Sequence, residues 1–505
     1  MSSLARWIIT IGLEVHVQLS TKLKLFSRAL AENHKAPNSA VSFFDISLPG
    51  TLPIVNPEAI RLATKAALVC NCEIAPSLEF DRKHYVYSDQ RAGFQITQKR
   101  RPLGTNGFVR LNAALDGVEK DQLVEIKCLQ LEQDTGKTVN ELNEDLVLLD
   151  FNRANVPLIE VVTAPCFHSP HDAACFLRKL QTILRLANVS DAKMELGNMR
   201  CDVNVSVASA ENPTKQLATV ELKNLPSIRY VEIASELEAK RQIELLNNGS
   251  SPVPETRSYD VEKNATVFLR KKRGPSDYMY LPEADIPEIT LTSAYVDDVR
   301  KSIGPSVDEL LETLLQKKYF NLQDAKALLQ TEDGLSYYQV LVGELEKVTS
   351  SMSPDVQLKA EKLIPFWLVN EYVGDCANAP DEKRDLDTIP PADLAFLLGN
   401  LANGTLSAYA AKHILQLAVQ DPKKNSIYKL VNENANAEFD ENTLKDLVNE
   451  LIQANGDKVN ALKVGKDGVL NWFIGNVMRR SSGKAKPDEI KRLINNTVLC
   501  ENSSK

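Results

Sequence analysis

Near the amino terminus, apolar and polar residues alternate along the stretch WIITIGLEVHVQLST, which runs from Trp7 to Thr21. Successive side chains of a β-strand point to opposite faces, so this pattern predicts a strand with one buried face. The polar face is unusual because it carries a carboxylate and an imidazole, Glu14 and His16, about 7 Å apart along the strand. This face is either an ordinary hydrated sheet surface or one wall of a site.

Four further segments combine an apolar face with acidic side chains on the other face. Glu132 lies in LQLEQDTGK, Asp202 in DVNVSV, and Glu221 and Lys223 in TVELKNL. In VPLIEVVTAP, Glu160 is the single charge in an apolar run, and a buried carboxylate is costly unless it meets a cation or a metal. Each segment alone is more often a hydrated sheet face, but together they favour a site. Carboxylates with one imidazole suit Mg²⁺ or Mn²⁺ better than zinc, and Mg²⁺ held in this way usually carries nucleotide phosphates.

Positive side chains are the expected partners of such phosphates. FDRKHYVYSD places Arg82 and Lys83 beside aromatic residues, although a hydrated turn explains this pair equally well. The chain has no GxxxxGK[ST] loop, no protein-kinase motif set and no GxSxG elbow. If ATP binds, the sequence therefore predicts a sheet-lined metal site rather than a glycine-rich loop.

The pattern changes along the 505 residues, which are too many for one compact core. Residues 1–295 mix short strands with two helices, one with Ser169 as its N-cap and one ended by Gly249. This mixture predicts an α+β domain with a mainly antiparallel sheet. Beyond it, apolar residues recur at helical spacing, which predicts a helical domain over 296–388 and a helical tail domain over 389–505.

Composition excludes some classes of protein. The mean hydropathy of −0.23 and the lack of a long apolar run argue against a membrane span. The eight cysteines form no C-x-x-C pair, which fits a reduced compartment. The leader MSSLARW is compatible with the stub of an organelle presequence.

A net charge of −8 excludes a globally basic nucleic-acid binder, so any RNA contact requires a local patch. One candidate lies between Asp457 and Arg492, where nine Lys or Arg residues stand against four acidic residues. A hydrated helix face explains this surplus equally well. The candidate RNA-binding residues within it are Lys466, Arg479, Arg480, Lys484 and Lys486.

Eight motifs, in this order, resemble the B subunit of the tRNA-dependent amidotransferase, the glutamyl-tRNA(Gln)/aspartyl-tRNA(Asn) amidotransferase of bacteria and organelles. They are GLEVHVQLSTKLKLFS, LPGTLPIVNPEA, FDRKHYVYSD, LEQDTGK, DFNRANVPLIEVV, MRCDVNVSV, VELKNLPS and ETRSYD. The tail fits as well, through NGTLSAYAAKHIL and VGKDGVLNWFIGNVMRRSSGKAKPDEI. The resemblance therefore covers nearly the whole chain.

The resemblance implies a glutamine-synthetase-like cradle that binds ATP and Mg²⁺ and phosphorylates the side-chain carboxylate of Glu misacylated onto tRNA(Gln). Ammonia from a partner amidase (A) subunit then displaces the phosphate, and a small third subunit completes the complex. The implied metal ligands are Glu14, His16, Glu132 and Glu160, and the implied catalytic residues are Glu132, Lys83, Asp202, Glu221 and Lys223. The implied ATP-binding residues are Lys83 and Lys223, with Arg91 expected beside them, and the basic tail residues are implied to contact tRNA.

Three departures from the family pattern bear on these expectations. Ala92 replaces a lysine of the pattern YPDxPKxYQ, so Arg91 is the candidate substitute, and Gln133 replaces an acid that follows Glu132. Ser27 and SFFDISLPG stand where some members carry a zinc-binding cysteine pair, so no zinc is expected. The losses at positions 92 and 133 keep open a non-catalytic tRNA-binding scaffold. A stand-alone metal hydrolase is a third reading. The substitutions favour a fungal-like copy in the mitochondrial matrix, with the cytoplasm as the alternative.

Overall fold

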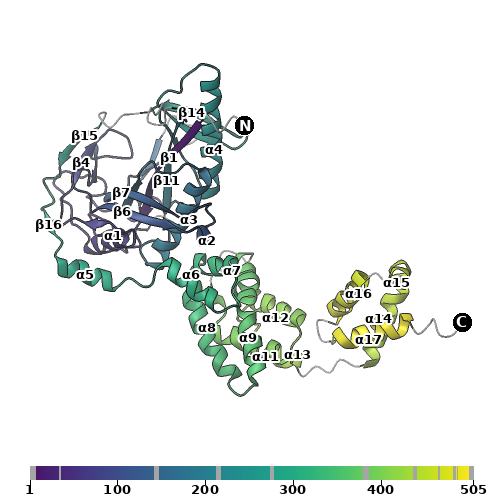
Figure 1. Ribbon diagram of the computed structural model, residues 1–505. Coiled ribbons are helices and arrows are strands. Elements are labelled where there is room, and N and C mark those ends of the chain that lie inside the picture. Colours follow the sequence, from purple (N-terminus) through teal and green to yellow (C-terminus); the bar gives the residue numbers. More distant parts are fainter. Residues whose placement is uncertain are drawn as a thin grey trace. The chain divides into compact units, whose positions relative to one another are not determined.

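The computed structural model describes residues 7–32, 36–140, 147–211, 218–272, 278–378, 386–435, 441–463, 467–481, 485 and 487–499. The chain divides into two compact units, Met1–Leu310 and Leu311–Lys505 (Figure 1). The first unit holds the β-sheets and the second is helical. The expected three domains, with boundaries at 295 and 388, stay a prediction.

A nine-stranded sheet forms the centre of the first unit, in the order β14-β13-β12-β11-β1-β10-β7-β6-β2. Every neighbouring pair is antiparallel except β12 and β13, which are parallel. The predicted α+β class with a mainly antiparallel sheet is confirmed. The strands span Trp7–Gln18 (β1), Glu73–Ile74 (β2), Gly104–Leu111 (β6), Gln122–Gln133 (β7), Pro157–Thr163 (β10), Met199–Ser209 (β11), Val220–Lys223 (β12), Glu255–Asp260 (β13) and Ala265–Lys271 (β14).

Helices cover one face of this sheet. The odd-numbered residues of β1 from Ile11 to Val17 are fully buried in a core shared with α1 (Pro57–Val69), α3 (Pro170–Leu186) and α4 (Ile228–Asn247). Figure 1 shows α3 and α4 on one side of the sheet, with β4 and β15 on the other. Alternation along β1 therefore turns its polar residues away from the helices.

The two predicted helix signals are close to what the structure shows. Ser169 is the N-cap of α3, where its hydroxyl accepts a hydrogen bond from the backbone N–H of Asp172 at 3.4 Å. At the end of α4 the cap residue is Asn248, and Gly249 follows it with a φ of +74°. Glycine adopts this left-handed conformation without the steric cost that a Cβ imposes, so it still ends the helix.

A three-stranded sheet in the order β15-β4-β5 lies over the polar side of the large sheet. Its strands are β4 (Asp81–His84), β5 (Phe94–Thr97) and β15 (Met279–Pro282), and β5 contacts β7. The amide of Gln95 donates to the backbone carbonyl of Gln133 at 2.8 Å, which joins the two sheets. The remaining short elements are α2 (Ala113–Asp116), the pair β3 (Ser77–Leu78) with β16 (Ile289–Thr290), and the pair β8 (Lys137–Asn140) with β9 (Val147–Asp150).

The rest of the described chain is helical. After α5 (Ser293–Lys301) and α6 (Val307–Gln316) come α7 (Leu322–Gln330), α8 (Gly334–Thr349), α9 (Pro354–Pro365), the π-helix Phe366–Tyr372, α10 (Val373–Ala377), the short turn Leu386–Thr388, α11 (Pro391–Asn403), α12 (Ala408–Gln420) and α13 (Ile427–Ala435). The tail helices α14 (Glu441–Ala454), α15 (Gly456–Lys463), α16 (Asp467–Arg480) and α17 (Pro487–Leu499) share a core that includes Phe473 and Ile490. Among the described residues, no helix is long and apolar enough to cross a membrane.

Candidate active site

The register of the large sheet gathers the predicted residues on its polar face. His16 on β1 lies opposite Glu160 on β10, and Glu14 lies opposite Asp202 on β11. One strand further, Asn204 lies opposite Glu221 on β12. Residues that share a register and a face of neighbouring strands have side chains in contact range. Segments more than a hundred residues apart in the sequence therefore supply one surface.

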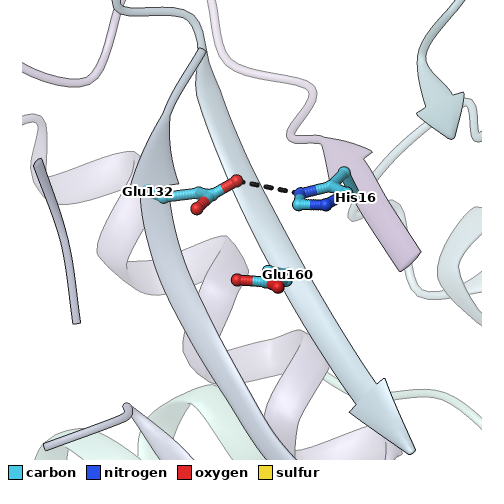
Figure 2. A group of neighbouring side chains, drawn as sticks. All are labelled: His16, Glu132 and Glu160. Carbon is cyan, nitrogen blue, oxygen red and sulfur yellow. Dashed lines mark hydrogen bonds and ion pairs between the residues drawn. The ribbon is translucent and has the colours of Figure 1, made fainter. Parts of the chain in front are cut away.

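His16, Glu132 and Glu160 form what we call the His–Glu cluster. Each offers one ligand atom, and these atoms lie within 4.8 Å of one another. Figure 2 shows the three side chains converging, with His16 Nδ1 2.9 Å from a carboxylate oxygen of Glu132. Glu132 is only 3% exposed, and Gln130 donates a hydrogen bond to Glu160. One imidazole and two carboxylates at this spacing match the donors that Mg²⁺ or Mn²⁺ takes in proteins.

The protonation of the His–Glu cluster follows from its burial and its charges. Burial by itself would lower the pKa of His16, but the hydrogen bond and charge of Glu132 raise it to about 9. Burial raises the pKa of Glu160, and the charge of Glu132 adds to that rise. Without a metal, the protonated ring of His16 thus balances the charge of the buried Glu132.

Glu14, Asp202 and Glu221 form a second group, the three-acid cluster, whose ligand atoms also lie within 4.8 Å of one another. Lys223 contacts Asp202 and lies 3.7 Å from a carboxylate oxygen of Glu221. The side-chain amide of Asn204 donates to Glu14 at 3.1 Å. Glu14 is therefore placed with Asp202 and Glu221, and the four residues expected as metal ligands are divided between two neighbouring clusters.

Lys83 faces these clusters from β4 of the small sheet. Burial would lower its pKa, but the charges of Glu132 and Glu160, together with Tyr280, raise it instead. Its Nζ lies 5.0 Å from the centroid of the Tyr278 ring, within the range of a cation–π contact. His16, Lys83, Glu132, Asp202 and Lys223 line one cavity of about 560 Å³, here called the central cavity.

Comparison with known proteins shows which family carries this arrangement of motifs. Residues 9–297 match the GatB/GatE catalytic domain, and residues 355–498 match the GatB domain. The chain belongs to the GatB family. It is 33% identical to the B subunit of the aspartyl/glutamyl-tRNA(Asn/Gln) amidotransferase of Rickettsia bellii, over 98% of both chains. It is 35% identical to the B subunit of the mitochondrial glutamyl-tRNA(Gln) amidotransferase of Scheffersomyces stipitis, over 94% of this chain and 92% of that one. The corresponding B subunit of the aspartyl/glutamyl-tRNA(Asn/Gln) amidotransferase of Bacillus licheniformis is 34% identical, over 96% and 97% of the two chains.

Two positions at which this GatB-family chain departs from the family pattern lie outside the lining of the central cavity. Arg91, Ala92 and Gln133 line a neighbouring cavity of about 300 Å³, and the Arg91 guanidinium lies 5.9 Å from the ring centroid of Phe151. Position 133 follows Glu132 in an alternating strand, so its side chain does not join the His–Glu cluster. The structure therefore does not bring Arg91 to the lining of the central cavity.

Arg200 is a lining residue of the central cavity that the sequence analysis did not single out. Its Nη2 lies 2.6 Å from a carboxylate oxygen of the buried Asp134, whose charge raises the pKa of Arg200 although burial opposes this. In MRCDVNVSV, Arg200 precedes Asp202 by two positions and so shares its strand face. This spacing from Asp202 is the sequence feature that could have identified Arg200 as a residue of the site.

The basic stretch of the tail is described only in part. Arg479 and Arg480 are exposed in the last turn of α16, and Arg480 Nη1 lies 3.4 Å from a carboxylate oxygen of Glu450. Lys466, Lys484 and Lys486 lie outside the described residues. RNA contact by these tail residues stays a prediction.

Proposed function

We propose that this chain is the B subunit of a tRNA-dependent amidotransferase. In this proposal it uses ATP to phosphorylate the side-chain carboxylate of Glu misacylated onto tRNA(Gln), and ammonia then replaces the phosphate to give Gln-tRNA(Gln). Membership of the GatB family supports the reaction class. The observation that carries the proposal is the His–Glu cluster, which faces Lys83 across the central cavity.

The donors of the two clusters fit a hard divalent cation. In the proposal His16, Glu132 and Glu160 hold one Mg²⁺, and Glu14, Asp202 and Glu221 offer a further set of carboxylate oxygens. Oxygen ligands with at most one imidazole are typical of Mg²⁺, whereas a structural zinc site needs cysteine or more histidine. When bound, Mg²⁺ neutralises charge on the phosphates of ATP. His16 must lose its proton before a ring nitrogen can act as a ligand.

Phosphoryl transfer needs positioning and charge stabilisation more than covalent chemistry from the protein. Lys83 supplies a positive charge from one wall of the central cavity, and the tyrosine rings beside it limit its movement. Lys223 supplies a second charge from the opposite wall, where Asp202 and Glu221 orient it. In this proposal the two lysines bind the phosphates and the carboxylate that attacks the terminal phosphate.

Where the chain departs from the family pattern, at Ala92 and Gln133, supports a catalytic subunit over a non-catalytic scaffold. Gln133 and Ala92 line the neighbouring cavity, whereas all the carboxylates and lysines implied for catalysis line the central cavity or belong to its two clusters. The departures from the family pattern therefore leave the implied catalytic carboxylates and lysines in place.

The remaining parts of the proposal rest on the family resemblance and on the pattern of the sequence. An amidase (A) subunit supplies the ammonia, a small third subunit completes the complex, and the basic tail residues contact the tRNA body. The catalytic cradle covers residues 1–295, a helical domain covers 296–388, and the tail covers 389–505. Relatives named as mitochondrial, at 34% to 35% identity, support a place in the mitochondrial matrix, although bacterial relatives are equally similar.

The test is ATP turnover by the chain co-expressed with an amidase subunit. We expect Mg²⁺-dependent ATP hydrolysis that Glu-tRNA(Gln) stimulates and uncharged tRNA(Gln) does not, together with formation of Gln-tRNA(Gln). Binding of tRNA without any ATP turnover would support the scaffold instead. ATP hydrolysis that ignores the charged tRNA would indicate a stand-alone hydrolase.

A further inference from the structure

Aromatic side chains gather beside Lys83, a residue of the small sheet that lines the central cavity. Tyr85 follows β4 directly, and its ring lies edge-on to Tyr87 at 5.7 Å and to Tyr278 at 6.2 Å between centroids. The outer part of this group is open to solvent, since Tyr87 is 43% and Val86 89% exposed. Lys83 lies within cation–π range of Tyr278 and lines the central cavity. The aromatic group therefore begins at the cavity and continues outward to the surface.

A basic run at the end of β14 reaches this aromatic group through Arg270. Arg270 and Lys272 belong to the run RKK at positions 270–272, in a chain whose net charge is −8. Arg270 pairs with Thr256, whose hydroxyl reaches Glu221, so Arg270 lies on the polar face of the sheet. Its guanidinium donates to the hydroxyl of Tyr87 at 3.2 Å. Lys272 contacts the side chain of Asn204 on the same face.

An open aromatic surface beside an exposed arginine is the combination that proteins use for unpaired nucleotides. Bases stack on the rings, and the positive side chains bind the phosphates. We propose that Tyr87, Tyr85 and Arg270 bind the unpaired 3′-terminal nucleotides of the acylated tRNA. The inference rests on the proposed function, because it needs a substrate that carries its reactive carboxylate at the 3′ end of an RNA.

The position of the surface favours the RNA end over the adenine of ATP. The glutamyl group is attached to the last nucleotide, so that nucleotide must lie next to the cavity that holds Lys83 and the His–Glu cluster. The rings of Tyr85 and Tyr278 lie 6.0 Å and 5.0 Å from the ammonium of Lys83, which lines that cavity. An adenine pocket encloses its base, whereas Tyr87 is 43% exposed to solvent. Arg270 stands beside Tyr87, where the phosphate of the preceding nucleotide would lie.

The experiment compares two RNAs and a set of variants in the co-expressed complex. The RNAs are tRNA(Gln) transcripts with and without the terminal adenosine, and binding is measured by fluorescence anisotropy in the absence of turnover. The variants are Tyr87→Ala, Tyr87→Phe and Arg270→Ala. The matched controls are Val86→Ala, next to Tyr87, and Lys263→Ala, in the same hairpin as Arg270 and 70% exposed.

Removal of the terminal adenosine should weaken binding to the unchanged complex by about 5- to 150-fold, the range for loss of one stacked base. Tyr87→Ala should weaken binding of the full-length RNA by a similar factor and remove most of the difference between the two RNAs. Tyr87→Phe should keep that difference because the ring remains. Arg270→Ala should lower the slope of log affinity against log salt by about one, and both controls should behave like the unchanged complex.

Other results overturn the inference. If the complex binds both RNAs equally, or if Tyr87→Ala alters neither affinity, the aromatic surface does not bind the RNA end. If Tyr87→Ala instead raises the KM for ATP and leaves RNA affinity unchanged, the surface holds the nucleotide cofactor. Failure of the unchanged complex to bind any tRNA(Gln) would refute the proposed function itself. Melting temperatures separate these outcomes from misfolding, since Tyr87→Phe retains the packing of the ring.

Discussion

Mg²⁺ should bind to the His–Glu cluster more tightly as the pH rises. In the metal-free chain, the hydrogen bond and charge of Glu132 outweigh burial and hold the pKa of His16 at about 9 instead of the ordinary 6.5. A ring nitrogen becomes a ligand only after its proton leaves, so binding at neutral pH releases one proton. Between pH 7 and pH 8 the apparent association constant should therefore increase about tenfold, or about 1.4 kcal/mol.

Isothermal titration calorimetry of Mg²⁺ into the metal-free complex checks this value. Two buffers of different ionisation enthalpy give the number of protons released, which should be about one per metal ion at pH 7. His16→Asn should bind Mg²⁺ weakly and with little pH dependence. His413→Asn, at an exposed position on α12, is the matched control and should leave the pH dependence intact. Equal affinity at pH 7 and pH 8, with no proton released, would show that His16 is not a ligand.

Three further predictions concern the fold and the tail. Asp45→Ala should lower the free energy of unfolding by about 3–5 kcal/mol, because it removes the acidic partner of Lys24 from an ion pair whose side chains are both 0% exposed. Urea unfolding measures this change, and a loss below 1 kcal/mol would contradict the prediction. Ser169→Ala should cost about 1 kcal/mol by removing the N-cap of α3, whereas Ser169→Asn should cost little; the difference in urea midpoint checks it. The last prediction replaces four basic tail residues by Ala, namely Arg479, Arg480, Lys484 and Lys486. The KM for charged tRNA should rise and its salt dependence should become weaker, while kcat changes little. An unchanged salt slope, with a normal circular dichroism spectrum, would show that these residues form only a hydrated surface.

The period of the apolar residues was sufficient to predict the site-bearing strands. Alternation in WIITIGLEVHVQ requires that Glu14 and His16 leave the helix-covered face, and the structure places them so. The same argument applies to Glu132, Glu160 and Asp202, because each is an acidic residue whose neighbours on both sides in the strand are apolar or point to the opposite face. A strand face is a local property, so the sequence reveals it.

Partners across strands are not a local property. The sequence indicated that Glu14 and His16 share a strand face, but it did not indicate that the register of β1 with β11 places Glu14 opposite Asp202 or that β12 adds Glu221. The parallel pairing of β12 with β13 and the contact between Arg270 and Tyr87 likewise depend on chain connections that no short pattern encodes. Arg200 was missed although it shares the face of Asp202, because a basic residue in a strand more often points to solvent.

The most direct test of a catalytic role for the His–Glu cluster is the substitution Glu132→Gln in the co-expressed complex. Gln keeps the shape of the side chain but removes the charge that balances His16 and that a metal would need. The matched control is Glu236→Gln, at a side chain that is 56% exposed on α4. The measurement is ATP-dependent formation of Gln-tRNA(Gln) alongside glutamine hydrolysis by the partner amidase. We expect Glu132→Gln to abolish the first activity and to leave the second largely intact, with no effect of Glu236→Gln. Full formation of Gln-tRNA(Gln) by the Glu132→Gln complex would contradict the assignment of the site.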